Sequence, residues 1–231
     1  MYLSVFVATG IAQSVLFLWT FLLWRDTRIA ALGITLPPVF FFAWDDFRIA
    51  VSPFIGLGDT LYWLTWPGYW AHWLLGSWLL IASVSVLRLA GLDIFQARWV
   101  MGGCCLVAVG LTLHDLPQFW TRDLHPVCDL EIMRYGISVN EGNRCFASQP
   151  LVPGNIPITP VMACLIALGS GIVLWARRKI PWLAIGSIAM LITALPAFSR
   201  HGLEYLGEAL IEVGLVASIW VMIRKPKDQL T

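Results

Sequence analysis

The sequence predicts an all-α integral membrane protein: a bundle of seven transmembrane helices with an outside N-terminus, a cytoplasmic C-terminus and a disulfide-tied extracytoplasmic loop. Three observations predict this fold. Apolar residues make up 58% of the 231 residues and charged residues only 13%, whereas a soluble domain has about one half and one quarter. Seven apolar segments are long enough to be spans, and Lys and Arg gather on one side of them.

The composition also excludes several classes of protein. A mean hydropathy of +0.76, with 13 Trp and 12 Phe, is incompatible with a disordered chain or an ordinary cytosolic enzyme. The formal net charge is only +1. We therefore expect no nucleic-acid partner, because such proteins carry strongly basic surfaces.

A transmembrane helix needs about 20 mostly apolar residues. We place seven spans at residues 2–24, 29–44, 69–91, 99–115, 159–176, 180–198 and 203–223. The second span is the shortest and contains Pro37 and Pro38, which remove backbone donors and predict a kink. Residues 49–68 are also largely apolar, and we expect them to form an interfacial or re-entrant segment rather than an eighth span. The first span has no basic n-region or clear cleavage site, so we expect a retained helix and no signal peptide.

The basic residues favour one orientation of this bundle. With the N-terminus outside, one side receives ten of them: Arg25, Arg28, Arg88, Arg98, Arg177, Arg178, Lys179, Arg224, Lys225 and Lys227. The opposite side receives five: Arg48, Arg122, Arg134, Arg144 and Arg200. Because short cytoplasmic loops accumulate Lys and Arg, we expect the first side to be cytoplasmic. The bacterial inner membrane is the expected location.

The loop between the fourth and fifth spans, Leu116 to Ile158, is the largest soluble segment of the predicted single domain. Its five prolines predict a compact, irregular cap that acts as a lid. Cys128 and Cys145 both lie in this loop, with sixteen residues between them. Since the charge pattern places the loop outside the cytoplasm, where disulfides persist, we predict that these two cysteines are linked. In the chain-entropy model such a bridge contributes about 3 kcal/mol.

Histidines from three different spans lie at similar depth on the outer side. They are His72, His114 and His201, and they are accompanied by Asp115 and Glu204. Imidazole and carboxylate groups are ligands for transition metals and are also general acids and bases. We therefore predict that His72, His114 and His201 bind a metal such as Zn²⁺ or iron, or a haem, or act in acid–base chemistry with Asp115 or Glu204.

The last span carries a stripe of carboxylates. Glu204, Glu208 and Glu212 follow Arg200 at intervals of four residues and therefore share one helical face. At about 1.5 Å per residue, Glu212 lies roughly 13 Å inside the outer end of the helix, near the bilayer midplane. An ionised acid there costs about 2.5–3.5 kcal/mol, so it is normally buried, paired or protonated and marks a functional site. We count these three glutamates and Asp115 as candidate catalytic residues.

Three functions fit these features. The first is a polar site near the outer leaflet that binds or acts on a lipid-like or hydrophobic ligand, with or without a metal or haem. The second is a non-catalytic subunit of a larger membrane complex, and the third is a transporter or proton path along Glu204, Glu208 and Glu212. The sequence contains no HExxH, GxxxxGK[ST], GxGxxG or CxxCH motif that would select one of them.

Overall fold

The structure, a computed structural model, describes residues 2–154, 158–195 and 202–224, and most of these residues are helical. Each of the seven predicted spans overlaps a helix of twelve residues or more. These helices are α1 (Tyr2–Thr27), α2 (Ala30–Ile55), α3 (Asp59–Leu89), α5 (Arg98–Asp115), α7 (Ile158–Arg178), α8 (Trp182–Thr193) and α10 (Leu203–Arg224). Two short helices, α4 (Asp93–Gln96) and α6 (Gln118–Thr121), lie in the connections.

The distribution of polar and apolar residues is that of a membrane protein. Among the described residues, four helices, α1, α3, α7 and α10, are long and apolar enough to cross a membrane. On α1 the large apolar side chains Ile11 and Val15 are exposed, while the polar side chains Gln13 and Thr20 are buried. Water-soluble proteins show the opposite arrangement. The seven-span count and the orientation remain predictions.

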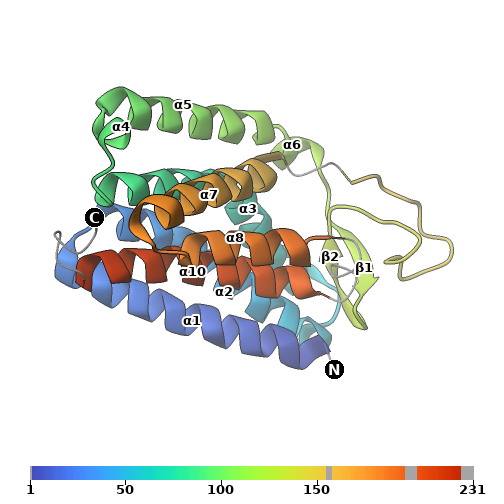
Figure 1. The fold of residues 1–231 in the computed structure, drawn as a ribbon. Coiled ribbons are helices and arrows are strands. Elements are labelled where there is room, and N and C mark those ends of the chain that lie inside the picture. The colour runs from blue at the N-terminus through green and yellow to red at the C-terminus, as the bar shows by residue number, and fades with distance from the viewer. Residues whose placement is uncertain (1, 155–157, 196–201, 225–231) are drawn as a thin grey trace.

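The long helices lie side by side (Figure 1). Contacts run in sequence from α1 through α2, α3, α7 and α8 to α10, and α10 returns to α1 and α2, so that these six helices close a ring. Helix α5 packs on the outside of the ring, mainly against α3. The largest apolar core joins the helices of the ring, with Leu32, Leu80, Leu174, Leu183 and Leu215 buried in it.

Glycines allow three helices of the ring to approach very closely. A Cβ atom at Gly186 of α8 would collide with a carbonyl oxygen of α10, and one at Gly214 of α10 would collide with a carbonyl oxygen of α8. A Cβ atom at Gly171 of α7 would likewise collide with backbone atoms of Ala184 on α8. Small residues at such positions let backbones touch, which is how membrane helices gain packing energy.

Residues 49–68 differ from the prediction. They are not a separate interfacial or re-entrant segment, because α2 continues through the first part of this stretch and α3 includes the second. Gly56 connects the two helices with a φ of 73°, a left-handed conformation that glycine adopts without a steric penalty. The charged residues after the predicted second span do not end α2, because Asp45 and Arg48 pair inside the bundle.

The segment between α5 and α7 contains the predicted disulfide. Cys128 and Cys145 are bonded, with their Cα atoms 4.9 Å apart. The segment is not wholly irregular, because β1 (His125–Asp129) and β2 (Ile132–Gly136) form an antiparallel hairpin. Its turn residues, Leu130 and Glu131, have φ values of 53° and 61°, as in the type I′ turns that match the twist of paired strands. The hairpin lies at the end of the bundle where α1 begins (Figure 1).

Candidate functional site

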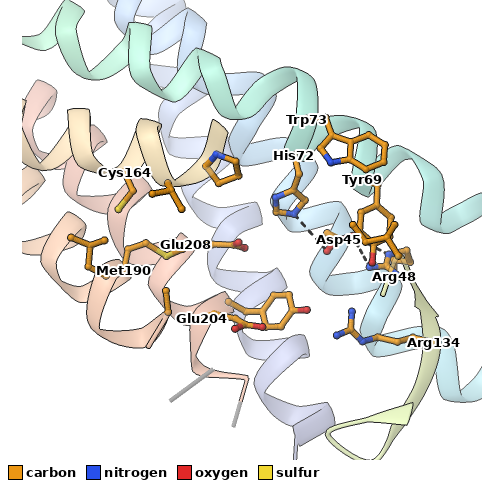
Figure 2. Close-up of a pocket in the computed structure, with 16 residues that line it drawn as sticks. Asp45, Arg48, Tyr69, His72, Trp73, Arg134, Cys164, Met190, Glu204 and Glu208 are labelled. Atoms are coloured by element: carbon orange, nitrogen blue, oxygen red, sulfur yellow. Dashed lines mark hydrogen bonds and ion pairs between the residues drawn. The ribbon is translucent and has the colours of Figure 1, made fainter. Parts of the chain in front are cut away.

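A cavity of about 400 Å³ lies at the hairpin end of the bundle. Residues of α2, α3, α7, α8, α10 and the hairpin region line it (Figure 2). The ionisable side chains of the lining, which we call the charged wall, come from two sides: Asp45, Arg48, His72 and Arg134 from α2, α3 and the hairpin, and Glu204 and Glu208 from α10. The apolar wall, from α7 and the C-terminal end of α8, consists of Pro160, Val161, Cys164, Met190, Leu191 and Ala194. The cavity therefore offers two chemically different surfaces to one molecule.

A buried ion pair anchors the charged wall. Arg48 donates from Nη2 and Nε to one carboxylate oxygen of Asp45, at 2.7 and 3.0 Å. The pair is three residues apart on α2, so the two side chains lie on one helical face. Arg48 also donates to the hydroxyl of Thr65 on α3 at 3.3 Å, and its side chain is only 2% exposed. The charge of Arg48 is thus neutralised inside the bundle and held in one position.

His72 of α3 faces the other carboxylate oxygen of Asp45. The distance from its Nε2 to Asp45 Oδ2 is 4.0 Å, and the imidazole packs against the ring of Phe42. Tyr69 lies one turn earlier on α3 and lines the cavity together with Trp73. These aromatic side chains of α3 lie beside the polar groups of the cavity.

The hairpin contributes Arg134 to the cavity. Arg134 lies on β2 and donates to Asp129 at 2.9 Å, across the turn of the hairpin. Burial disfavours the charged form of Arg134, but Tyr205, Tyr69 and Asp129 outweigh this effect and hold the pKa of Arg134 above its usual value. A permanently charged group thus reaches the cavity from the cap.

Helix α10 contributes Glu204 and Glu208, which the sequence had singled out. Figure 2 shows Glu208 pointing into the cavity from the side opposite His72 and Asp45. Among the described residues, Glu208 makes no hydrogen bond or ion pair. It also lines a narrow extension of about 50 Å³ that shares His72, Cys164 and Met190 with the main cavity. Glu208 is therefore available to a bound molecule.

Glu212, one turn further along α10, does not line the cavity. It is 0% exposed and lies between α10 and α1. Its two carboxyl oxygens have no hydrogen-bond partner of good geometry within the described residues. The carboxylate stripe is thus divided between the cavity and the interior of the bundle.

The three predicted metal-binding histidines do not converge in the described part of the chain. His114 is 57% exposed at the end of α5, where its Nδ1 lies 2.9 Å from Oδ1 of Asp115. Neither residue lines the cavity that contains His72. His201, like Arg200, lies outside the described residues. In the ranges that the structure describes, no three or more His, Cys, Asp or Glu side chains are grouped so that they could hold a metal ion.

The sequence analysis missed several residues of the cavity. The prediction ends the second span at residue 44, just before Asp45, and counts Arg48 only among the basic residues of the outer side. A sequence signal did exist, because the sixteen-residue second span is the shortest of the seven, and an acid and a base at i, i+3 can pair if the helix continues. No comparable signal marks Arg134 or Tyr205, since they reach the cavity only through the tertiary fold.

Comparison with known protein families, characterised proteins and solved structures found no match to this chain.

Proposed function

We propose that this membrane protein binds an amphipathic, lipid-like molecule in the cavity at the hairpin end of the bundle. The observation that carries the proposal is the pairing of a charged wall from α2, α3 and α10 with an apolar wall from α7 and α8. Small-molecule sites are mostly apolar, with a few placed polar groups, and have volumes of about 300–1,000 Å³. A molecule with a polar head and an apolar chain satisfies both walls at once.

The polar wall is suited to proton exchange with the bound head group. Asp45 lies behind His72, as a carboxylate does when it orients an imidazole that accepts or donates a proton. Glu208 faces them from α10 and has no partner of its own among the described residues. We assign His72 and Glu208 as the acid–base groups of the site, with Asp45 as a positioning residue.

The position of this site in the membrane is part of the proposal. The hairpin lies on the side that the charge pattern predicts to be outside, and the disulfide fits an oxidising compartment. In a seven-span bundle of the bacterial inner membrane, the cavity then opens near the outer leaflet, within reach of lipids. This placement supports a lipid-like ligand over a cytoplasmic metabolite.

Photolabelling tests the proposal. The probe is a lysophospholipid with a diazirine on its acyl chain, added to the protein in mild detergent, followed by peptide mapping. We expect labelled peptides from α7 and α8, because the apolar wall contains Val161, Cys164 and Met190. Val161→Trp fills the cavity and is expected to reduce this labelling to a small fraction of the wild-type level.

Met162→Trp is the matched control. Met162 is the next residue on the same helix and is exposed without lining the cavity. The control is expected to label like the wild type. Equal labelling of Val161→Trp and Met162→Trp would show that the probe binds only the outer surface, and the proposal would fail.

A further inference from the structure

The structure contains a second group of buried polar atoms, between α1 and α10. The side chains of Gln13 and Glu212 belong to residues that are 1% and 0% exposed. Within the described residues neither makes a hydrogen bond of good geometry, although the two groups lie close enough to interact. Buried polar groups are nearly always hydrogen-bonded, so an unpaired amide facing an unpaired carboxyl needs a chemical explanation.

A proton on Glu212 provides that explanation. A carboxylic acid and a primary amide are complementary: the acid O–H donates to the amide oxygen, and an amide N–H donates to the acid carbonyl. The oxygen and nitrogen of Gln13 can exchange places, so the amide can present either group to Glu212. An ionised Glu212 can accept an N–H from Gln13, but it has no O–H to donate, so the amide oxygen of Gln13 would stay unpaired.

The groups on the surrounding helices also favour a neutral Glu212. Helix α10 packs against α8, α1, α2 and α3. Helix α8 contains no ionisable residue, and α1 presents the uncharged Gln13. Helix α2 presents Asp46, a second carboxyl group, and two ionised carboxylates so close together would repel each other. Helix α3 presents His72, on the cavity side of α10, and Glu208 is the neighbouring acid on α10 itself.

We propose that Glu212 and Gln13 form a proton-binding site between α1 and α10, and that this site exchanges its proton with the cavity through Glu208. The two glutamates are four residues apart and share one face of α10. Glu208 reaches both the cavity and its narrow extension, whereas Glu212 reaches neither. In the transfer a proton passes from one carboxyl group to the other, and no electrons or other groups move.

This site goes beyond ligand binding. It gives the cavity one exchangeable proton stored in the interior of the bundle. The site does not depend on which molecule the cavity binds, so it can be tested without a ligand.

Infrared spectroscopy of the purified protein in H2O and D2O tests the proposal. We expect a carbonyl band of a protonated carboxyl group that disappears in Glu212→Gln. Gln13→Leu is expected to keep the band but shift it to higher frequency, because the acid loses its hydrogen-bond partner. Glu208→Leu is expected to keep the band and to slow its deuterium shift by about tenfold or more, since the exchange route is interrupted.

Glu141→Gln is the matched control, because Glu141 lies on the exposed cap in an ion pair with Arg144. It is expected to leave the band and its exchange unchanged. Retention of the full protonated-carboxyl intensity in Glu212→Gln would overturn the proton assignment, and wild-type exchange in Glu208→Leu would overturn the route. A sodium-dependent gain in thermal stability that is lost in Glu212→Gln would identify a cation site instead. If Glu212→Gln does not fold, the band shift in Gln13→Leu and the exchange rate in Glu208→Leu still decide the matter.

Discussion

The Asp45–Arg48 pair is buried, and such a pair is costly to break from one side. Arg48→Leu leaves the Asp45 carboxylate without its partner, so we expect the free energy of unfolding to fall by about 3–5 kcal/mol. The double variant Asp45→Leu/Arg48→Leu buries no charge and is expected to lose much less. Thermal unfolding in detergent measures both.

Arg25→Leu provides the comparison, because the Arg25–Asp26 pair is 57% and 63% exposed at its two side chains. Exposed pairs contribute about 0–1 kcal/mol, so this variant is expected to unfold like the wild type. Equal effects of Arg25→Leu and Arg48→Leu would mean that the α2 pair is hydrated.

Gly68 of α3 lies next to the Asp45–Arg48 pair. A Cβ atom at Gly68 would collide with the carboxylate of Asp45, so Gly68→Ala is expected to displace that carboxylate from Arg48 and His72. We expect reduced photolabelling of the cavity and a lower melting temperature. At Gly103 of α5 a Cβ atom meets nothing within 4 Å, and Gly103→Ala should be neutral or stabilising by up to about 1 kcal/mol. A silent Gly68→Ala would show that the carboxylate can move without consequence.

The sequence was informative about residues whose position alone is unusual. Glu208 and Glu212 stand out because an acid deep in an apolar segment is expensive wherever the neighbouring helices lie. Arg134 and Tyr205 are ordinary residues at their own positions, and they become part of the site through the docking of the hairpin and the packing of α10. His114 and His72 looked equivalent by depth, but depth does not determine which face of a helix is turned toward the cavity.

At the scale of elements, the hairpin links the disulfide to the cavity. Cys128 lies on β1, and β1 pairs with the strand that carries Arg134. Cys128→Ser/Cys145→Ser removes the bridge, which for a loop of this size is worth about 3 kcal/mol in the chain-entropy model. We expect weaker retention of the photoprobe and a lower melting temperature, because Arg134 is held less firmly. Both are measured on the unreduced protein.

Cys105→Ser is the control for this double variant, since Cys105 is a free, exposed cysteine on α5. It is expected to behave like the wild type. Unchanged probe labelling after loss of the bridge would show that the hairpin is positioned by its contacts with the bundle alone.

The boundary between α2 and α3 is one that the apolar pattern of the sequence does not locate. Apolar runs fix the middle of a span, where the cost of a polar group is highest. They do not fix its end when charged residues pair with each other, as Asp45 and Arg48 do. The assignment of residues 49–68 failed for that reason, whereas α7 and α10 end at basic residues close to the predicted limits.

At the scale of the whole molecule, the orientation of the bundle can be tested directly. The ten-to-five division of Lys and Arg predicts that the segment from Leu116 to Ile158 is external and the C-terminal tail cytoplasmic. A single cysteine introduced at Ser138 should react with a membrane-impermeant maleimide added to intact cells, and one at Gln229 should not. The free cysteines of the helices are replaced first.

Permeabilised cells are the control, in which both introduced cysteines should react. Labelling at Gln229 but not at Ser138 in intact cells would invert the orientation, and it would place the cavity on the cytoplasmic side. Labelling of both positions in intact cells would contradict the odd number of spans predicted between Ser138 and Gln229.

The glycine contacts at Gly171, Gly186 and Gly214 also determine how the molecule can deform. Where backbones already touch, helices cannot approach further, and they can separate only by losing many contacts at once. Helices α7, α8 and α10 are therefore expected to move as one rigid unit beside the cavity. The Cys128–Cys145 bridge lies within the segment between α5 and α7, so the hairpin is held against the bundle by side-chain contacts such as those of Ile132 with Phe6 and Ile49. A molecule in the cavity therefore meets a rigid surface on the side of α7, α8 and α10.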